Sequence, residues 1–321
     1  MIIMNHHGGV GNSLFVYCLG KALAKELDTE LYHGTIRNRR GKEAIDIAAV
    51  STLFPRFADL PSDTTSRPDT VYFGHEIELE NILRRGHPRD IALGQSGSGI
   101  SFFQKYEEYY KPYKSLIKRE WLVVKDPYSA QDPDDLVIHL RLGDVAEQDQ
   151  LRRLVPLMPF EYYEYLLKKV NYRKLHLVTT DPTHPLVRKF DSYRPKIIHG
   201  DQVHDFKSIM AFNKISIPIS TFSWWAAYLS NAREIYFPVF DYGLWWGLPD
   251  KPHIGAPDLR VRERRYIYYR PPDQWEPGLP PPRYRTHDIW MDRIKKYLGL
   301  PVWAGNRLKR AIRSLTNKHS T

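Results

Sequence analysis

The sequence predicts an α/β protein built from two α/β halves that meet near residue 130. Short apolar runs that end in polar residues alternate with helical patterns, as expected for open parallel sheets flanked by helices. The chain has 321 residues, of which 42% are apolar, so it is long enough to bury two cores of ordinary domain size. Its content of 26% charged and 13% aromatic residues excludes a disordered, collagen-like or coiled-coil protein.

The first half opens with a strand, a glycine-rich loop and a helix. The strand covers residues 2–5, the loop covers residues 8–12, and the apolar positions of the helix continue to Leu23. Cys18 lies on the apolar stripe of this helix, where we expect a buried structural thiol. Residues 34–120 are broken by Pro and Gly, and their pattern defines no order of elements.

The second half alternates more regularly between strands and helices. Strands are predicted at residues 136–141, 175–179, 215–220 and 234–237, the last of these being the last strand of the chain, and helices at residues 159–170, 205–213 and 222–229. Ligands of open α/β sheets bind at the carboxyl ends of the strands. The polar residues that follow these strands are therefore the candidates for a functional site.

Cysteine content and hydropathy restrict the class of protein. The single Cys excludes a disulfide framework and a Cys-based zinc site, and it favours a reducing compartment. No stretch approaches the roughly 18 apolar residues that cross a bilayer, and residues 1–9 contain neither a basic region nor a small-residue cleavage site. We therefore expect a cytoplasmic protein with neither a membrane span nor a secretion signal.

The net charge of +10 is concentrated near the C-terminus. Residues 260–321 carry 15 Lys and Arg against 5 Asp and Glu, whereas residues 1–259 carry 32 charges of each sign. Because residues 1–259 are neutral, an extended nucleic-acid-binding face is not expected, and neither is a nucleic-acid partner. The basic segment, with an amphipathic stretch at residues 303–315, either contacts anionic membrane peripherally at its inner face or is only solvated.

Glycines follow the first strand in a pattern that allows two interpretations. Gly9 and Gly11 lie between a strand and a helix, as in a dinucleotide-binding fingerprint or in a simple tight turn. Leu14 stands where the fingerprint needs its third glycine. The tight turn is therefore the better interpretation.

Two further motifs follow strands of the second half. In His139-Leu-Arg141-Leu-Gly143-Asp144, the planar guanidinium suits a diphosphate, and the alternative is an Arg141–Asp144 ion pair that closes a turn. In Ser220-Thr221-Phe222-Ser223-Trp224-Trp225, hydroxyl groups at a strand-to-helix junction either bind phosphate or cap the helix. The adjacent tryptophans are either core residues or a stacking surface for a sugar.

These motifs occur in one order and spacing: Gly8-Gly9-Val10-Gly11-Asn12-Ser13-Leu14-Phe15 with Tyr17, then the His139 motif, then the Ser220 motif. In this arrangement the chain resembles the family 11 glycosyltransferases, the α-1,2-fucosyltransferases, from residue 1 to about residue 240. The resemblance implies a GT-B-like fold with two Rossmann-like domains facing a cleft. Residues 1–130 would form the acceptor-side domain, residues 131–259 the GDP-sugar-binding domain, and residues 260–321 a basic segment whose helix crosses back or binds the membrane surface.

The resemblance also implies a reaction and its partners. The enzyme would transfer L-fucose from GDP-β-L-fucose, with inversion and without a metal or cofactor, to the 2-hydroxyl of a terminal β-galactosyl residue of a glycan. A lipid-linked acceptor would account for a membrane contact. The alternative is a non-catalytic GDP-sugar or glycan-binding protein that uses the same clefts.

Carried over to this sequence, the resemblance assigns roles to individual residues. Arg141 would hold the β-phosphate, His139 would lie beside the guanosine, and Asn12 would approach the donor from the first domain. The diphosphate would be bound by Thr221, Phe222 and Ser223. Asp205 occupies the place of a guanine-binding aspartate, although its position also suits a helix N-cap.

The catalytic residues implied are Arg141 and Asp144. Asp144 acts either as the base or as a partner that orients Arg141, and Glu147 and Asp149 are the other candidates for a base. Leu142 replaces a second Arg that is frequent in the family, so the remaining phosphate charge would have to be met elsewhere. The available groups are His199, His204, Lys207 and the helix N-termini.

A metal-dependent alternative rests on Asp132-x-Asp134, because paired carboxylates can bind the Mg²⁺ or Mn²⁺ that neutralises a diphosphate. Asp-Pro-Asp-Asp before a buried strand is, however, typical of a turn. We therefore predict a turn at this position and no metal site.

Overall fold

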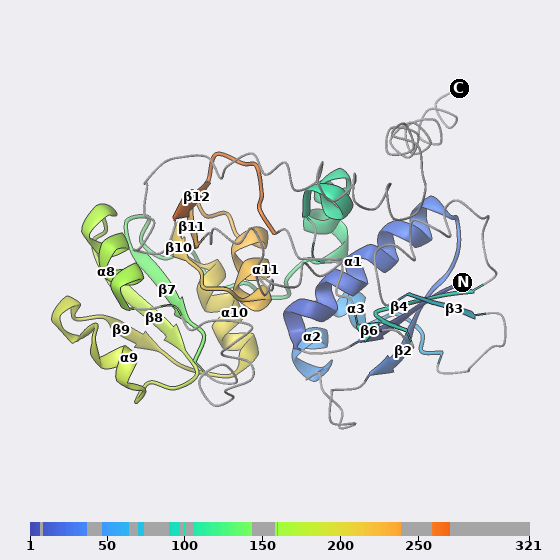
Figure 1. Cartoon of the computed structure of the whole chain (residues 1–321), viewed down its shortest axis with the longest axis horizontal. Coiled ribbons are helices and arrows are strands. Elements are labelled where there is room, and N and C mark those ends of the chain that lie inside the picture. The colour runs from blue at the N-terminus through green and yellow to red at the C-terminus, as the bar shows by residue number, and fades with distance from the viewer. Residues whose placement is uncertain are drawn as a thin grey trace, which may run out of the picture. The chain divides into compact units, whose positions relative to one another are not determined.

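The computed structural model describes residues 1–6, 9–36, 47–63, 70–73, 90–96, 99–100, 104, 106–142, 158, 160–238 and 259–269. These residues belong to one compact unit, Met1–Gly278, which contains two parallel sheets (Figure 1). The predicted α/β class, with two parallel sheets flanked by helices, is confirmed. None of the helices described is long and apolar enough to cross a membrane.

The first sheet has the strand order β2-β1-β4-β3, and all of its strands are parallel. Its strands are β1 (Ile2–His6), β2 (Leu31–Ile36), β3 (Thr70–Phe73) and β4 (Asp90–Leu93). The helices of this half are α1 (Val10–Glu26), α2 (Ile47–Leu53) and α3 (Pro55–Ala58), and β5 (Gln95–Ser96) and β6 (Gly99–Ile100) form a small antiparallel pair. All five residues of the central strand β1 are buried.

The strands β3 and β4 lie in the region whose sequence pattern gave no order of elements. Each has four residues, so neither is long enough to display a clear periodicity. The later part of the same region is helical and comprises η1 (Tyr106–Tyr110), η2 (Lys111–Tyr113), α5 (Lys114–Leu116) and η3 (Ile117–Trp121). We call residues 106–121 the bridging helix.

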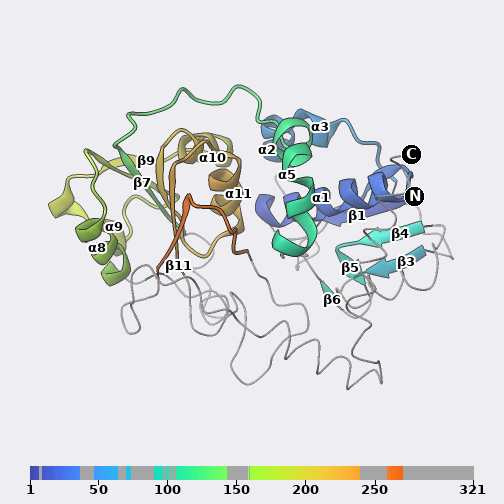
Figure 2. The same cartoon turned by 90° about the horizontal axis from the view of Figure 1, so that it is seen from above.

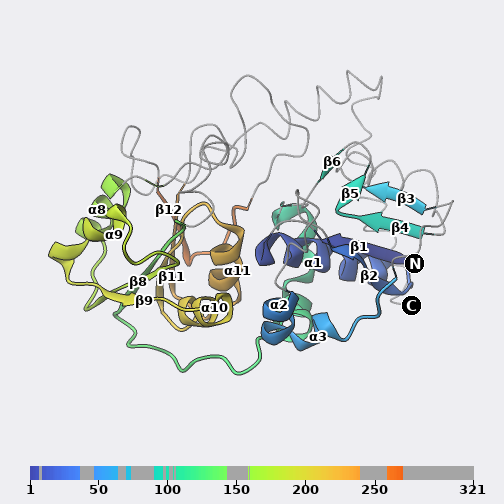
Figure 3. The ribbon, with the colours of Figure 1, turned by 90° about the horizontal axis from the view of Figure 1, so that it is seen from below.

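An extended segment connects the bridging helix to the second sheet (Figures 2 and 3). It covers residues 122–135. The Lys125 N–H donates to the carbonyl oxygen of Leu53 in the first half at 2.9 Å, and the Gln131 N–H donates to the carbonyl oxygen of Ala211 in the second at 2.8 Å. The segment is therefore hydrogen-bonded to both halves.

The second sheet has six parallel strands in the order β12-β11-β10-β7-β8-β9. Its strands are β7 (Leu136–Leu140), β8 (Leu175–Thr179), β9 (Lys196–Ile198), β10 (Lys214–Ser216), β11 (Glu234–Pro238) and β12 (Tyr266–Tyr269). The helical elements of this half are α8 (Phe160–Lys169), α9 (Pro185–Arg188), η4 (Asp191–Tyr193), α10 (Gln202–Met210) and α11 (Thr221–Leu229). From β7 the chain adds β8 and β9 on one side, and it then returns to add β10, β11 and β12 on the other side. This is the Rossmann strand order, and the order of addition reverses between β7 and β10.

The end of the second sheet corrects the sequence analysis. Residues 234–237 were expected to form the last strand, and residues 260–321 a separate basic segment. Instead, Tyr266–Tyr269 pairs with β11 in register Ile235↔Tyr266 to Pro238↔Tyr269 and completes the sheet. A run of aromatic and β-branched residues favours a strand, but the basic residues that flank this run conceal it in the sequence.

Candidate functional site

The carboxyl edge of the second sheet has a switch point between β7 and β10, where connections leave the sheet in opposite directions. Arg141 directly follows β7, and residues 217–220 follow β10 and lead into α11. Arg141 is half-buried, and its Nη1 donates to the carbonyl oxygen of Ile219 at 3.1 Å. Ligands of Rossmann-type sheets bind at such a point, so Arg141 lies at the expected edge.

The N-terminus of α11 forms one side of this edge. Ser220 is its N-cap, no side chain caps the helix, and its first turn contains no acidic residue. Ser223 is fully buried, and its Oγ donates to the Ser220 carbonyl oxygen at 3.4 Å. Among the groups predicted to bind the diphosphate, Thr221, Phe222 and Ser223 therefore offer chiefly the backbone N–H groups of a helix N-terminus.

The N-terminus of α1 meets that of α11. Trp225 Nε1 donates to the Gly11 carbonyl oxygen at 3.0 Å. A Cβ atom on Gly11 would lie 2.5 Å from the Phe222 nitrogen and 2.6 Å from Thr221 Oγ1, so any side chain here would force the two helices to shift. The second glycine of the Gly9-x-Gly11 pattern therefore serves the packing of two helices, an interpretation that the sequence analysis did not include.

Asn12 joins the two helix ends through its side chain. Its Oδ1 accepts a hydrogen bond from Thr221 Oγ1 at 3.0 Å and another from Gln104 Nε2 at 2.8 Å. The proton of the Thr221 hydroxyl is thus directed at Asn12. Gln104 is buried at 4% exposure, and sequence reasoning missed it because a lone amide in an irregular stretch carries no pattern.

Asp205 lies in the first turn of α10 with one carboxylate oxygen unpartnered. The residue is 4% exposed, and its Oδ1 has no hydrogen-bond partner among the residues described. Burial raises the pKa of Asp205 to about 7, while neighbouring His199 opposes this rise. The N-cap of α10 is Asp201, whose Oδ1 accepts from the His204 N–H at 2.7 Å, so the alternative N-cap role for Asp205 is wrong.

Aromatic contacts bring α10 and β7 next to α11. The rings of Phe206 and Phe222 are 5.3 Å apart, and those of His139 and Phe222 are 6.0 Å apart. Burial, with a smaller contribution from Arg141, lowers the pKa of His139 to about 3, and its Nδ1 has no partner in the described part of the chain. His139 is therefore a neutral imidazole near physiological pH and cannot supply phosphate-binding charge.

The three side chains named for the remaining phosphate charge lie in different places. His199 Nδ1 is 3.0 Å from the Thr179 carbonyl oxygen at the carboxyl end of β8, on the edge that carries Arg141. His204 Nδ1 is hydrogen-bonded to Tyr128 Oη at 3.0 Å, and Lys207 lies over the same tyrosine ring. Of these three residues, His199 is the one hydrogen-bonded at the carboxyl end of a strand, and its charge opposes the rise in the pKa of Asp205.

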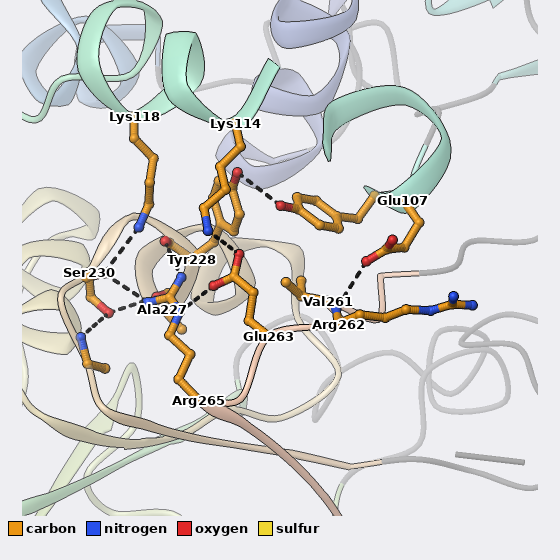
Figure 4. Close-up of polar contacts among 12 residues, drawn as sticks. Glu107, Lys114, Lys118, Ala227, Tyr228, Ser230, Val261, Arg262, Glu263 and Arg265 are labelled. Atoms are coloured by element: carbon orange, nitrogen blue, oxygen red, sulfur yellow. Dashed lines mark hydrogen bonds and ion pairs between the residues drawn. The ribbon is translucent and has the colours of Figure 1, made fainter. Parts of the chain in front are cut away.

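The opposite end of α11 is capped by cations (Figure 4). The Arg265 guanidinium donates to the carbonyl oxygens of Tyr228 at 2.9 Å and Ser230 at 3.0 Å. Glu263 accepts from Arg265 Nε at 2.9 Å and from Lys114 Nζ of the bridging helix at 2.5 Å. Positive charge at the carbonyl end of a helix complements its dipole, so these contacts stabilise α11 in its position.

Lys118 adds a second cation to this cap. Its Nζ donates to the Ser230 carbonyl oxygen at 3.5 Å and lies 5.4 Å from the centre of the Tyr228 ring (Figure 4). Burial, followed by the charge of Arg265, lowers the pKa of Lys118 to about 8. Like Gln104, these residues were missed, because their roles depend on contacts distant in sequence.

The paired tryptophans and Cys18 are core residues. Trp224 and Trp225 are fully buried, and the Phe15 ring of α1 packs against both at 5.1 and 4.7 Å. This burial leaves no face of either indole for a sugar to stack on. Cys18 is fully buried, and burial raises the pKa of its thiol, as an inert core cysteine requires.

The Asp132-x-Asp134 pair lies at the amino end of β7, on the edge opposite Arg141. Asp132 pairs with Arg173 at 3.0 Å and Asp134 with Lys214 at 3.2 Å. The Asp135 N–H donates to the Asp132 carbonyl oxygen at 3.0 Å, which closes the predicted turn. The pair therefore has a structural role at a distance from the candidate site.

Several predicted features lie outside the described residues. They are Asp144 with Gly143, the alternative bases Glu147 and Asp149, and the basic segment beyond residue 269. The predicted Arg141–Asp144 ion pair lies outside them as well.

Comparison with known proteins gives distant structural matches. No protein-family model matches the chain, and no curated protein sequence does. The α-1,6-fucosyltransferase NodZ, in a crystal structure with GDP, matches over 73% of this chain and 93% of its own, at 13% identity and a TM-score of 0.43. Heptosyltransferase II from E. coli matches over 83% of this chain and 92% of its own, at 13% identity and a TM-score of 0.39. Likeness at this level transfers no activity from those enzymes to this chain.

Proposed function

We propose that this chain is a glycosyltransferase whose donor is a guanine nucleotide sugar, GDP-β-L-fucose. The observation that carries the proposal is the switch point of the second sheet. There, Arg141 lies beside the α11 N-terminus, and the α1 N-terminus joins it through Gly11 and Asn12. Neither helix has an acidic residue in its first turn or a side-chain cap. Such an arrangement favours a dianionic group.

The proposed base specificity rests on Asp205. A carboxylate can accept hydrogen bonds from both N1–H and the 2-amino group of guanine, a pair of donors that adenine lacks. The unpartnered Oδ1 of Asp205 is a buried acceptor that such a base would satisfy. A buried carboxylate without a ligand is costly, so binding would remove part of that cost.

The proposed reaction transfers the sugar with inversion. The acceptor hydroxyl attacks the anomeric carbon, the bond from that carbon to the β-phosphate oxygen breaks, and GDP leaves with the electron pair. Arg141 and the helix N–H groups stabilise the charge that develops on the leaving diphosphate, which is the task of a metal ion in metal-dependent enzymes. We propose Asp144 as the group that receives the hydroxyl proton or orients Arg141.

The identity of the sugar and linkage rests on the sequence resemblance. The three motifs favour fucose as the transferred sugar and the 2-hydroxyl of a terminal β-galactosyl residue as the acceptor. We propose that residues 1–130 bind the acceptor and residues 131–259 the donor. The rival is a GDP-sugar-binding protein without turnover.

One assay separates these proposals. The protein is incubated with GDP-fucose and an array of galactosides in excess EDTA, GDP release is measured, and the product linkage is determined. We expect acceptor-dependent GDP release and an α-1,2 linkage. Tight GDP binding without release would favour the non-catalytic rival, and release that requires Mn²⁺ would overturn the metal-independent mechanism.

We also propose that the basic residues 302–321 contact anionic membrane, where a lipid-linked acceptor would be found. Arg307, Lys309, Arg310 and Arg313 alternate with apolar residues, and each basic residue near such a surface contributes about 1 kcal/mol. Deleting residues 302–321 should lower sedimentation with anionic vesicles and spare activity on a soluble acceptor. Equal sedimentation of both proteins would leave a solvated segment as the interpretation.

A further inference from the structure

The orientation of the Asn12 amide is set by two hydrogen bonds to one atom. Gln104 Nε2 and Thr221 Oγ1 both donate to Asn12 Oδ1, at 2.8 and 3.0 Å. With its oxygen so engaged, the amide turns Nδ2 away from both donors, and no described residue accepts a hydrogen bond from Nδ2. Asn12 is half-buried in the first turn of α1, and Nδ2 carries two N–H groups that are not used by the contacts of Oδ1.

The two donors are not equivalent. A threonine hydroxyl rotates and can donate or accept, so Thr221 would tolerate either orientation of the Asn12 amide. Gln104 is 4% exposed and donates through its amide nitrogen, so with Gln104 in this orientation a reversed Asn12 amide would bring two N–H groups together. Gln104 therefore holds the oxygen of Asn12 on the protein side.

We propose that Gln104 is a positioning residue that fixes the Asn12 amide with its N–H groups toward the diphosphate of the donor. This inference rests on the proposed function, because it names a determinant of diphosphate binding at the same site. A reversed Asn12 would present its carbonyl oxygen to the phosphate oxygens, and two acceptors repel each other. The polarity of Gln104, rather than its volume, is therefore its contribution.

The substitutions Gln104→Glu and Gln104→Leu separate polarity from volume. Glu has nearly the shape of Gln, but as a carboxylate it accepts hydrogen bonds and does not donate. It should reverse Asn12, whereas Leu merely removes one donor. We expect Gln104→Glu to raise the GDP dissociation constant at pH 8 by about tenfold or more, and Gln104→Leu to raise it by about threefold. Hydrogen bonding predicts the larger loss for Glu, whereas packing would predict the larger loss for Leu, whose shape differs more from that of Gln.

The measurement is calorimetric titration with GDP and with guanosine, which lacks the diphosphate. Both variants should weaken GDP binding and leave guanosine binding unchanged. Lowering the pH should protonate the introduced carboxyl group, which then becomes a hydrogen-bond donor. The loss of GDP affinity in Gln104→Glu, relative to wild type at the same pH, should therefore diminish. Gln131→Glu, which introduces the same charge at an exposed position of the connecting segment, should bind GDP as wild type does.

The outcomes distinguish this inference from the function on which it rests. If wild-type protein does not bind GDP, the proposed function is wrong and the inference falls with it. If wild type binds GDP and Gln104→Glu binds it equally well, or loses GDP and guanosine affinity together, Gln104 has no positioning role. Should Gln104→Glu fail to fold, the GDP-specific loss in Gln104→Leu decides the matter.

Discussion

The two halves of the molecule contribute unequally to the candidate site. The second half supplies groups from several elements at one edge of its sheet, including Arg141, Asp205 and the α11 N-terminus. The first half supplies the end of one helix, with Gly11 and Asn12, and the buried Gln104 behind it. Under the proposed function, nucleotide recognition would belong to the second half, and the first half would complete the diphosphate site.

The largest expected effect tests the second half. Arg141→Ala should lower kcat/KM for GDP release by a factor corresponding to roughly 2–4 kcal/mol, because one preorganised charge donor is lost at the leaving group. Arg141→Lys should recover little, since an ammonium cannot form paired hydrogen bonds in one plane. Arg173→Ala, at the opposite edge of the sheet, is the matched control. Near-wild-type turnover of folded Arg141→Ala would remove Arg141 from the site.

Asp205 should have the next largest effect, a loss of GDP affinity that depends on pH. If the ionised carboxylate accepts from guanine, GDP affinity should fall below its pKa of about 7, approaching tenfold per pH unit. Asp205→Asn should bind GDP weakly and without this pH dependence, and it should lose less affinity for pyrophosphate. Titrations of GDP, ADP and pyrophosphate between pH 6 and pH 8.5 measure these differences. Unchanged GDP affinity in Asp205→Asn would leave the carboxylate without a role in base recognition.

The same carboxylate should make the ligand-free protein less stable at high pH. Its folded-state pKa lies above the unfolded value, so its contribution to stability is present below the unfolded pKa and is lost as pH rises through about 7. At pH 8, Asp205→Asn should therefore have a higher free energy of unfolding than wild type. Urea unfolding at pH 4 and pH 8 tests the sign, and a gain in stability at pH 4 alone would contradict it.

Gly11 tests the contribution of the first half. Ala normally stabilises a helix relative to Gly by up to about 1 kcal/mol, but at position 11 its Cβ would meet the backbone of α11 at 2.5 Å. Gly11→Ala should therefore destabilise by about 1–3 kcal/mol and weaken GDP binding less than Arg141→Ala does. Gly9→Ala, with nothing within 4 Å, should change stability by less than about 1 kcal/mol. Similar unfolding curves for both variants would argue against the close helix contact.

Arg265 gives the smallest effect on the site, because it acts at the far end of α11. Arg265→Ala should lower the free energy of unfolding by about 1–2 kcal/mol through the lost carbonyl contacts, with little change in GDP affinity. It should also raise the pKa of Lys118 above about 8, since the charge of Arg265 is one of the causes of its depression. A lower Lys118 pKa, measured by NMR titration, would contradict this electrostatic account.

The positions of strands could be predicted well from the sequence where the strands are buried on both faces. All residues of β7 and β8 are buried, so their apolar runs were evident, and β8 was predicted at its observed bounds. Strand β10 was extended to residue 220, although it ends at Ser216, because Ile217 and Ile219 remain buried after leaving the sheet. Strand β9 was missed, since its residues are exposed or half-buried at the sheet edge.

The site residues divide in the same way. Arg141, Asp205 and Asn12 were identified because they lie in or near recognisable motifs, and the structure brings Asn12 to Thr221 across 209 positions of sequence. Gln104 acts through Asn12, which is 92 positions away in the sequence. Arg265 acts through the end of α11, which is about 35 positions away. Pairings at such separations depend on the tertiary fold, which periodicity and local composition do not encode.

Strand β12 has a consequence for shortening the chain. Residues 259–269 provide both the edge strand that covers β11 and the arginine that caps α11. A protein ended at residue 259, where the charge balance changes, would expose the hydrogen-bonding edge of β11, whose Ile235, Tyr236 and Phe237 are buried. Exposed apolar edges of this kind recruit other chains. A shortened version should therefore retain Tyr269 if it is not to gain a new tendency to self-associate, whatever the role of the residues that follow.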